Sequence, residues 1–117
     1  MKRGIFQVRS KIWVEISGRP ALGPGRRKLL RAVDEQGSIS GAARFIGMTY
    51  RKAWGQIQAM EEEFGAPLVT KQTGGKDGGG ARLTPEARDL IARYDQLIEG
   101  VEDQVNAKFK DFFYGDR

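Results

Sequence analysis

The chain has 117 residues, and its 20 lysines and arginines against 15 aspartates and glutamates give it a formal net charge of +5. It has no cysteine and no histidine, which excludes disulfides and thiolate metal sites and removes the commonest catalytic base, so we expect no enzyme activity, no metal and no cofactor. No apolar run approaches the roughly 20 residues of a membrane span, and the first residues lack the apolar core of a signal peptide. These features predict one cytoplasmic domain over residues 1–117 with no membrane partner.

The positive charge is concentrated in the first half of the chain. Residues 1–56 hold 12 basic and 3 acidic side chains, whereas residues 57–117 hold 8 basic and 12 acidic ones. A segregated positive region supplies the salt-sensitive attraction on which phosphate binding depends. A membrane surface would also attract it, but glycines and prolines interrupt the amphipathic helix that membrane binding requires. The charge distribution therefore predicts nucleic acid as a partner.

The first predicted elements are a strand and a helix. Apolar and polar residues alternate over about residues 5–16, which is the period of a half-buried strand. The segment GRPALGPG that follows predicts a turn, and residues 27–36 then carry apolar side chains at helical spacing and end at Gly37. Arg26 and Arg27 lie at the start of this helix, where we expect them to contact DNA phosphates.

Residues 38–64 predict a helix-turn-helix. The stretch GSISGAARFIGMTYRKAW places a small alanine pair where two helices cross, Gly47 where the chain reverses, and Thr49 where it can cap the next helix. That helix carries an apolar stripe of Ala53, Ile57, Met60 and Phe64. An ordinary helical hairpin with solvated basic residues is the alternative.

The start of this second helix is the predicted recognition surface. In a docked helix-turn-helix, the first turn of the second helix faces base edges in the major groove. Trp54 follows the buried stripe closely, so we interpret it as a packing residue and leave it out of the site. The predicted reading residues are Thr49, Tyr50, Arg51, Lys52 and Gln56.

A glycine-rich hairpin is predicted over residues 67–84. Two short strand candidates flank QTGGKDGGG, and Lys71, Lys76 and Arg82 would reach phosphates or a minor groove beside the recognition helix. A nucleotide-binding loop is rejected, because Asp77 rather than Ser or Thr follows the lysine. A disordered loop without function remains an alternative.

The last third predicts one long helix over about residues 85–113. Thr84 is a natural N-cap, and Pro85 suits the first helical position. Such a helix would be longer than the body of so small a domain, so we expect its far half to join two copies into a homodimer. The alternative is that it folds back on its own core. The predicted interface residues are Ile98, Val101, Val105, Phe109 and Phe112.

The motifs GSISGAARFIGMTYRKAW, PLV, TGGKDGGGARLT and RYDQLI, in this order, resemble the N-terminal DNA-binding domain of ModE-type molybdate-responsive regulators, itself similar to the winged helix of LysR-type regulators. The resemblance covers about residues 26–98. It implies a mainly α fold with small β elements, a dimeric winged helix-turn-helix that binds operators of molybdenum-related genes. It also implies that residues 49–52 begin the recognition helix and that Lys76 lies on the wing.

Two departures limit what the resemblance implies. Asp77 follows the wing lysine where the family commonly has glycine, which weakens phosphate approach there. The chain also stops at Arg117, without the oxyanion-binding domain of full-length ModE-type regulators, so we expect no molybdate site. The favoured hypothesis is a sequence-specific DNA-binding transcriptional regulator. The alternative is a protein-interaction module that dimerises with another regulator and does not read DNA.

Overall fold

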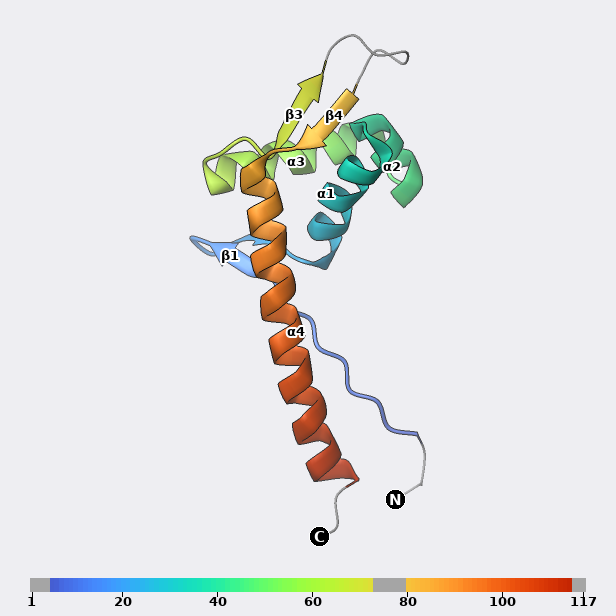
Figure 1. The fold of residues 1–117 in the computed structure, drawn as a ribbon, viewed down its shortest axis with the longest axis vertical. Helices are drawn as coiled ribbons and strands as arrows, with labels where there is room; N and C mark the ends of the chain where they lie inside the picture. Colours follow the sequence, from blue (N-terminus) through green and yellow to red (C-terminus); the bar gives the residue numbers. More distant parts are fainter. Residues whose placement is uncertain (1–4, 73–79, 115–117) are drawn as a thin grey trace.

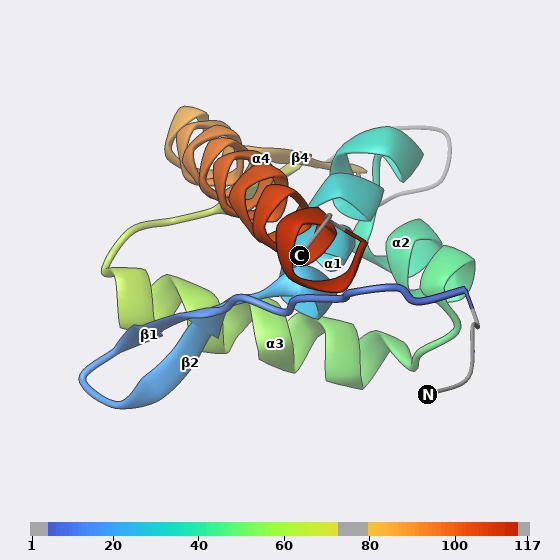
Figure 2. The ribbon, with the colours of Figure 1, turned by 90° about the horizontal axis from the view of Figure 1, so that it is seen from below.

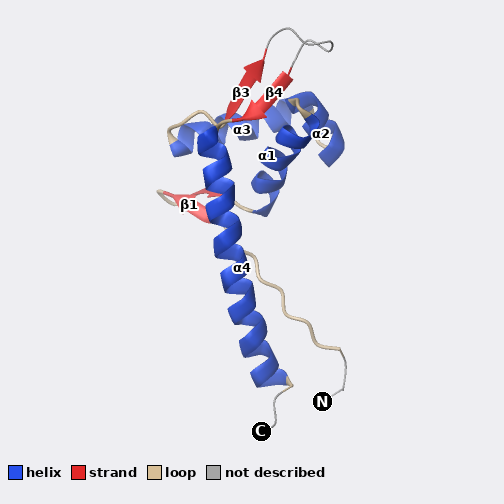
Figure 3. Ribbon diagram, in the orientation of Figure 1, coloured by secondary structure: helices blue, strands red, loops and turns tan. Residues whose placement is uncertain are grey.

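The computed structural model describes residues 5–72 and 80–114 (Figures 1 and 3). Helices dominate these residues, and the strands form two separate antiparallel hairpins. This arrangement confirms the predicted mainly α fold with small β elements. In chain order the elements are β1 (Val14–Ile16), β2 (Arg19–Leu22), α1 (Pro24–Gln36), α2 (Ile39–Ile46), α3 (Tyr50–Phe64), β3 (Val69–Gln72), β4 (Gly80–Leu83) and α4 (Pro85–Phe113).

Helices α1, α2 and α3 enclose the core beside the first turns of α4 (Figure 1). The apolar positions of each helix recur every three or four residues, so one face of each points inward. Leu29 and Leu30 of α1 belong to the same buried cluster as Ile57 and Met60 of α3, and all four are fully buried. Each such side chain contributes about 1.5–3 kcal/mol to folding by leaving water. The packed core fixes α3 rigidly to the rest of the fold.

The turn between α2 and α3 has the geometry that the sequence predicts. Gly47 ends α2 with a φ of 90°, a left-handed conformation that glycine adopts without strain. Thr49 then caps α3, because its Oγ1 accepts a hydrogen bond of 3.1 Å from the backbone N–H of Lys52. Ser38 caps α2 in the same way through Gly41. These caps confirm the predicted helix boundaries.

The N-terminal strand is shorter than predicted. Only Val14–Ile16 pair in β1, and their partner β2 lies within the segment that we expected to be a turn. The chain reverses at Ser17 and Gly18, which both have positive φ, so the true turn is shorter and earlier. The alternating pattern was misleading because a strand needs a partner, and β2 offers only four residues.

The second hairpin, β3 with β4, forms the base of a wing. Leu83 of β4 pairs with Val69 of β3, and Ala81 donates a backbone hydrogen bond of 2.8 Å to Gly37 at the end of α1. Glu61 of α3 accepts hydrogen bonds from the backbone N–H groups of Leu68 and Val69 through one carboxylate oxygen. The wing base is therefore held against both α1 and α3.

Helix α4 extends far beyond the core and gives the molecule its principal extents of 64 × 29 × 21 Å. Its described bounds agree with the prediction, and Figure 1 shows that it does not fold back. The N-terminal segment runs along α4 (Figures 1 and 2). The Tyr94 hydroxyl of α4 donates a 2.7 Å hydrogen bond to the carbonyl of Ile12 in this segment. Near the far end, the Phe6 and Phe113 rings lie 5.7 Å apart. The helix is thus partly covered by its own chain.

Candidate nucleic-acid interface

The first turn of α3 faces solvent. Thr49, Tyr50, Arg51 and Lys52 are all exposed, whereas Ala53 directly after them is fully buried. The core therefore fixes the direction of the helix, and its capped start projects outward with two cations. The structure brings these four predicted residues together on one exposed turn.

Gln56 is less exposed than the first turn of α3. It is half-buried and lines a cleft of about 440 Å³ between the helix-turn-helix and the β1–β2 hairpin, together with Met48 and Leu22. Gln56 follows Lys52 by one helical turn, so it lies on the same side of α3 at the edge of this cleft.

Trp54 is not the packing residue that we predicted. It is 41% exposed, and Tyr50, one helical turn earlier, is 49% exposed. The buried positions Ala53 and Ile57 are four residues apart, and a step of one residue turns a helix by about 100° away from that stripe. The helical period was therefore the signal that places Trp54 near the outer surface, and its size was a poor guide.

The wing contributes two described cations. Lys71 on β3 and Arg82 on β4 are both exposed. Lys71 pairs with Ala81, whereas Arg82 pairs with Thr70, and paired residues share a face of a hairpin. The two cations therefore lie on opposite faces of the wing. Lys76 and Asp77 lie outside the described residues.

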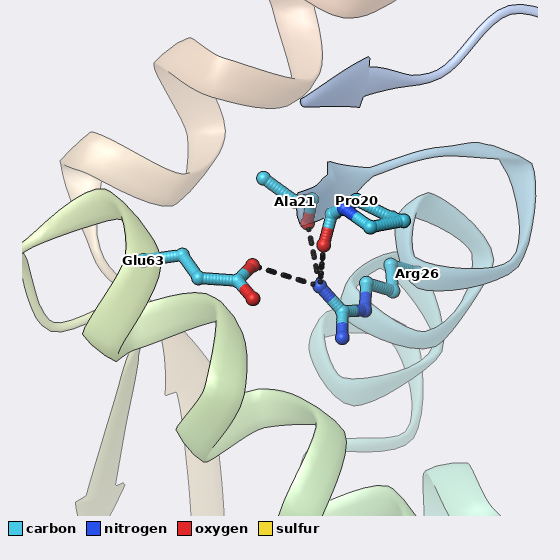
Figure 4. Close-up of polar contacts among 4 residues, drawn as sticks. All are labelled: Pro20, Ala21, Arg26 and Glu63. Atoms are coloured by element: carbon cyan, nitrogen blue, oxygen red, sulfur yellow. Dashed lines mark hydrogen bonds and ion pairs between the residues drawn. The ribbon is translucent and has the colours of Figure 1, made fainter. Parts of the chain in front are cut away.

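Arg26 points inward rather than toward a phosphate (Figure 4). Its Nη1 donates hydrogen bonds to the carbonyls of Pro20 and Ala21 at 2.9 and 3.0 Å, and lies 3.1 Å from a carboxylate oxygen of Glu63. The side chains of Arg26 and Glu63 are 24% and 19% exposed. The predicted phosphate contact would compete with these bonds, because this guanidinium joins β2, α1 and α3.

Arg27 is engaged in the same way on the other side of α1. It forms a bidentate ion pair with Asp95 of α4, in which Nε and Nη2 each lie 2.9 Å from a carboxylate oxygen. The hydrogen bond to Asp95 raises the pKa of Arg27, and the same bond lowers the pKa of Asp95. Arg27 therefore fastens α4 to α1, and the predicted phosphate contact would have to break this pair.

The predicted interface residues follow one side of α4. The first four are half-buried and Phe112 is 63% exposed, so a row of apolar surface continues beyond the core. Phe109 stacks on Phe113 with ring centroids 4.7 Å apart. The row comprises Ile98, Val101, Val105, Phe109 and Phe112.

The described residues contain no group of three or more acidic side chains placed to hold a metal ion. Over the same residues, none of the helices has the length and apolar character needed to cross a membrane.

The chain belongs to the lysR family of bacterial regulatory helix-turn-helix proteins, because the sequence model of that family matches residues 26–88. The matched region runs from the start of α1 into α4 and contains the helix-turn-helix and the wing. Membership makes the chain a bacterial regulatory helix-turn-helix protein over this region. The alternative of a module that does not read DNA gains no support.

Two curated relatives confirm the resemblance to ModE-type regulators. The chain is 49% identical over 80 residues to the molybdenum-pterin-binding protein MopB of Rhodobacter capsulatus, covering 68% of this chain and 30% of that protein. It is 42% identical over 76 residues to the DNA-binding transcriptional dual regulator ModE of Escherichia coli K12, covering 65% and 29%. The chain thus matches about a third of the length of these relatives.

Solved structures confirm the fold. The DNA-binding domain of CbnR in a complex with DNA matches with a TM-score of 0.56 at 20% identity, over 72% of this chain and 91% of that one. The DNA-binding domain of BenM with catB site 1 DNA matches with a TM-score of 0.53 at 24% identity, over 76% and 93%. The chain therefore has the winged helix-turn-helix fold.

Proposed function

We propose that this chain binds double-stranded DNA sequence-specifically, with the first turn of α3 in the major groove and the wing against the flanking backbone. The observation that carries the proposal is the exposure of Tyr50, Arg51 and Lys52 on a rigidly packed, capped helix start. Backbone N–H groups at a helix start and two cations both favour DNA phosphates and base acceptors. The core behind Ala53 holds the surface in place, so little ordering accompanies binding.

The contacting residues divide into two sets. Arg51 and Lys52 supply base-edge contacts, with Thr49 and Tyr50 beside them, while Lys71 and Arg82 supply sequence-independent contacts to phosphates. Gln56, one turn after Lys52, extends the base-reading set along the same side of α3. Lys76 belongs to the phosphate set by the family resemblance alone. Arg26 and Arg27 take no part, because their guanidinium groups hold the fold together.

We further propose that the protein acts in the cytoplasm as a homodimer joined by the apolar row of α4. Two copies would present two recognition helices to half-sites on one face of a duplex. The names of the relatives, a molybdenum-pterin-binding protein and ModE, favour molybdenum-related genes as targets. No molybdate site is assigned to this chain.

The test is a gel-shift titration against fragments of the source genome at two salt concentrations. Wild-type protein should bind, and affinity should fall steeply with salt because phosphate contacts release counterions. Arg51→Ala and Lys52→Ala should each weaken binding to selected fragments by about 1–3 kcal/mol and reduce discrimination against mixed DNA.

The matched control is Arg93→Ala. It removes the same charge from an exposed arginine of α4, far from α3 in sequence, whose partner Asp89 lies on the same helix. It should leave discrimination unchanged. Equal effects of Arg51→Ala and Arg93→Ala on every DNA would show that α3 is not the reading helix.

A further inference from the structure

Trp54 is an exposed apolar surface beside the cations of the recognition helix. It lies one turn after Tyr50, and among the described residues its ring makes no hydrogen bond or aromatic contact. Glu61, seven residues later and on the same face of α3, accepts hydrogen bonds from the base of β3. The indole therefore lies on the side of the recognition helix that faces the wing.

Gly55 follows Trp54 and leaves the outer surface of α3 without a side chain. It is exposed, and a Cβ atom added there would meet no atom within 4 Å. Glycine is among the least favourable residues inside a helix, and no packing requirement of this fold explains it. A glycine at this position would allow a binding partner to approach the helix backbone closely.

We propose that Trp54 and Gly55 together recognise the C5-methyl groups of thymines in the major groove. The methyl group is the one apolar feature that unmodified base pairs present there, and it distinguishes thymine from adenine, guanine and cytosine. The open surface at Gly55 admits the base edge, and the indole of Trp54 covers its methyl group. The neighbouring Arg51 and Lys52 favour a polyanion over a protein as occupant. This inference rests on the proposed function, since it specifies what the same helix reads.

The test uses one probe in two forms. A duplex fragment recovered from the source genome by the wild-type protein is amplified once with dTTP and once with dUTP, which lacks only the methyl group. Each lost methyl contact should weaken binding about fourfold, because burying one such carbon stabilises a complex by that factor. With two or more methyl groups, the wild-type protein should bind the uracil probe at least about tenfold more weakly.

Trp54→Ala should bind the thymine probe about tenfold more weakly and lose the difference between the two probes. Trp54→Phe, which keeps an aromatic ring, should retain part of it. Trp13→Ala is the matched control, because Trp13 is also exposed but lies in the loop before β1. Trp13→Ala should keep the wild-type affinity for the thymine probe and the wild-type ratio between the affinities for the two probes.

Gly55→Ala provides an independent test, because stability and binding should change in opposite directions. The alanine should raise the melting temperature by about 3–5 °C through its helix propensity, yet weaken binding to the thymine probe by about fivefold or more. Gly100→Ala makes the same change in α4, where an added Cβ also meets nothing within 4 Å. It should stabilise the protein and leave binding unchanged.

The inference is overturned if the wild-type protein binds both probes equally, or if Trp54→Ala keeps the wild-type ratio between them. It is also overturned if Gly55→Ala binds as tightly as wild type. Failure of the wild-type protein to bind either probe at low salt would instead overturn the proposed function, and this inference with it.

Discussion

Arg26 shows how a basic residue near a DNA-binding surface can serve the fold instead. A charge count from sequence cannot distinguish a solvent-facing arginine from one whose acceptor, Glu63, is 37 residues away. The charge count therefore predicts phosphate contacts for Arg26 and Arg27 alike. For Trp54 the error was the opposite one. Its large side chain predicts burial, but its position in the helical repeat places it near the exposed surface. By contrast, the capping of α3 by Thr49 was predictable, since a cap depends only on neighbours in sequence.

Arg26→Ala should lower the free energy of unfolding by about 2 kcal/mol. The substitution removes an ion pair and two hydrogen bonds to carbonyls, and it leaves the mostly buried carboxylate of Glu63 without its cation. Urea unfolding measures the loss. The double variant Arg26→Ala with Glu63→Gln should recover part of it. A loss below about 0.5 kcal/mol would contradict the structural role.

At the scale of elements, the bounds of a helix or strand could be predicted where they depend on neighbouring residues in the sequence. The bounds of α4 were predictable because Thr84 and Pro85 mark its start and the apolar repeat continues to its end. The predicted strand over residues 5–16 was mostly wrong, because pairing depends on a partner that the pattern does not reveal. Most of that segment instead lies along α4, held by the contact of Tyr94 with Ile12.

The contact between α1 and α4 should make stability depend on pH in acid. Arg27 lowers the pKa of Asp95, so the charged pair stabilises the fold above the unfolded pKa of about 3.9, and this stabilisation disappears as the pH falls through the lower folded value. Since the side chains are 36% and 41% exposed, solvent screening keeps the effect below about 1 kcal/mol.

Asp95→Asn tests this contact. The variant should be less stable than wild type at pH 7, and the difference in unfolding free energy should shrink as the pH falls below about 4. Asp89→Asn, whose partner Arg93 is on the same exposed helix face, is the control and should show little change at either pH. A difference that stays constant down to pH 2 would contradict the assignment.

At the scale of the whole molecule, α4 carries apolar surface away from the core, while the exposed cations Arg51, Lys52, Lys71 and Arg82 lie on α3 and the wing at the other end. This division fits a protein that dimerises at one end and binds DNA at the other. The apolar repeat of α4 could be predicted from the sequence. The packing of Phe6 against the far end of α4 could not, because this contact joins residues more than 100 positions apart.

Val101→Glu should separate the proposed dimer. A charge buried without a partner in the interface would weaken self-association by about a hundredfold or more, which sedimentation equilibrium would measure. Gln96→Glu adds the same charge on the opposite side of α4 and should leave association unchanged. If Val101→Glu associates as wild type does, the apolar row is not the interface.

The most direct measurement of the central claim is the set of backbone amide shifts that change when a selected duplex is titrated into the labelled protein. The largest changes should fall on residues 49–55, with smaller ones at Lys71 and Arg82. Changes confined to α4 and the β1–β2 hairpin, with the first turn of α3 unaffected, would contradict the assignment of α3 as the reading helix.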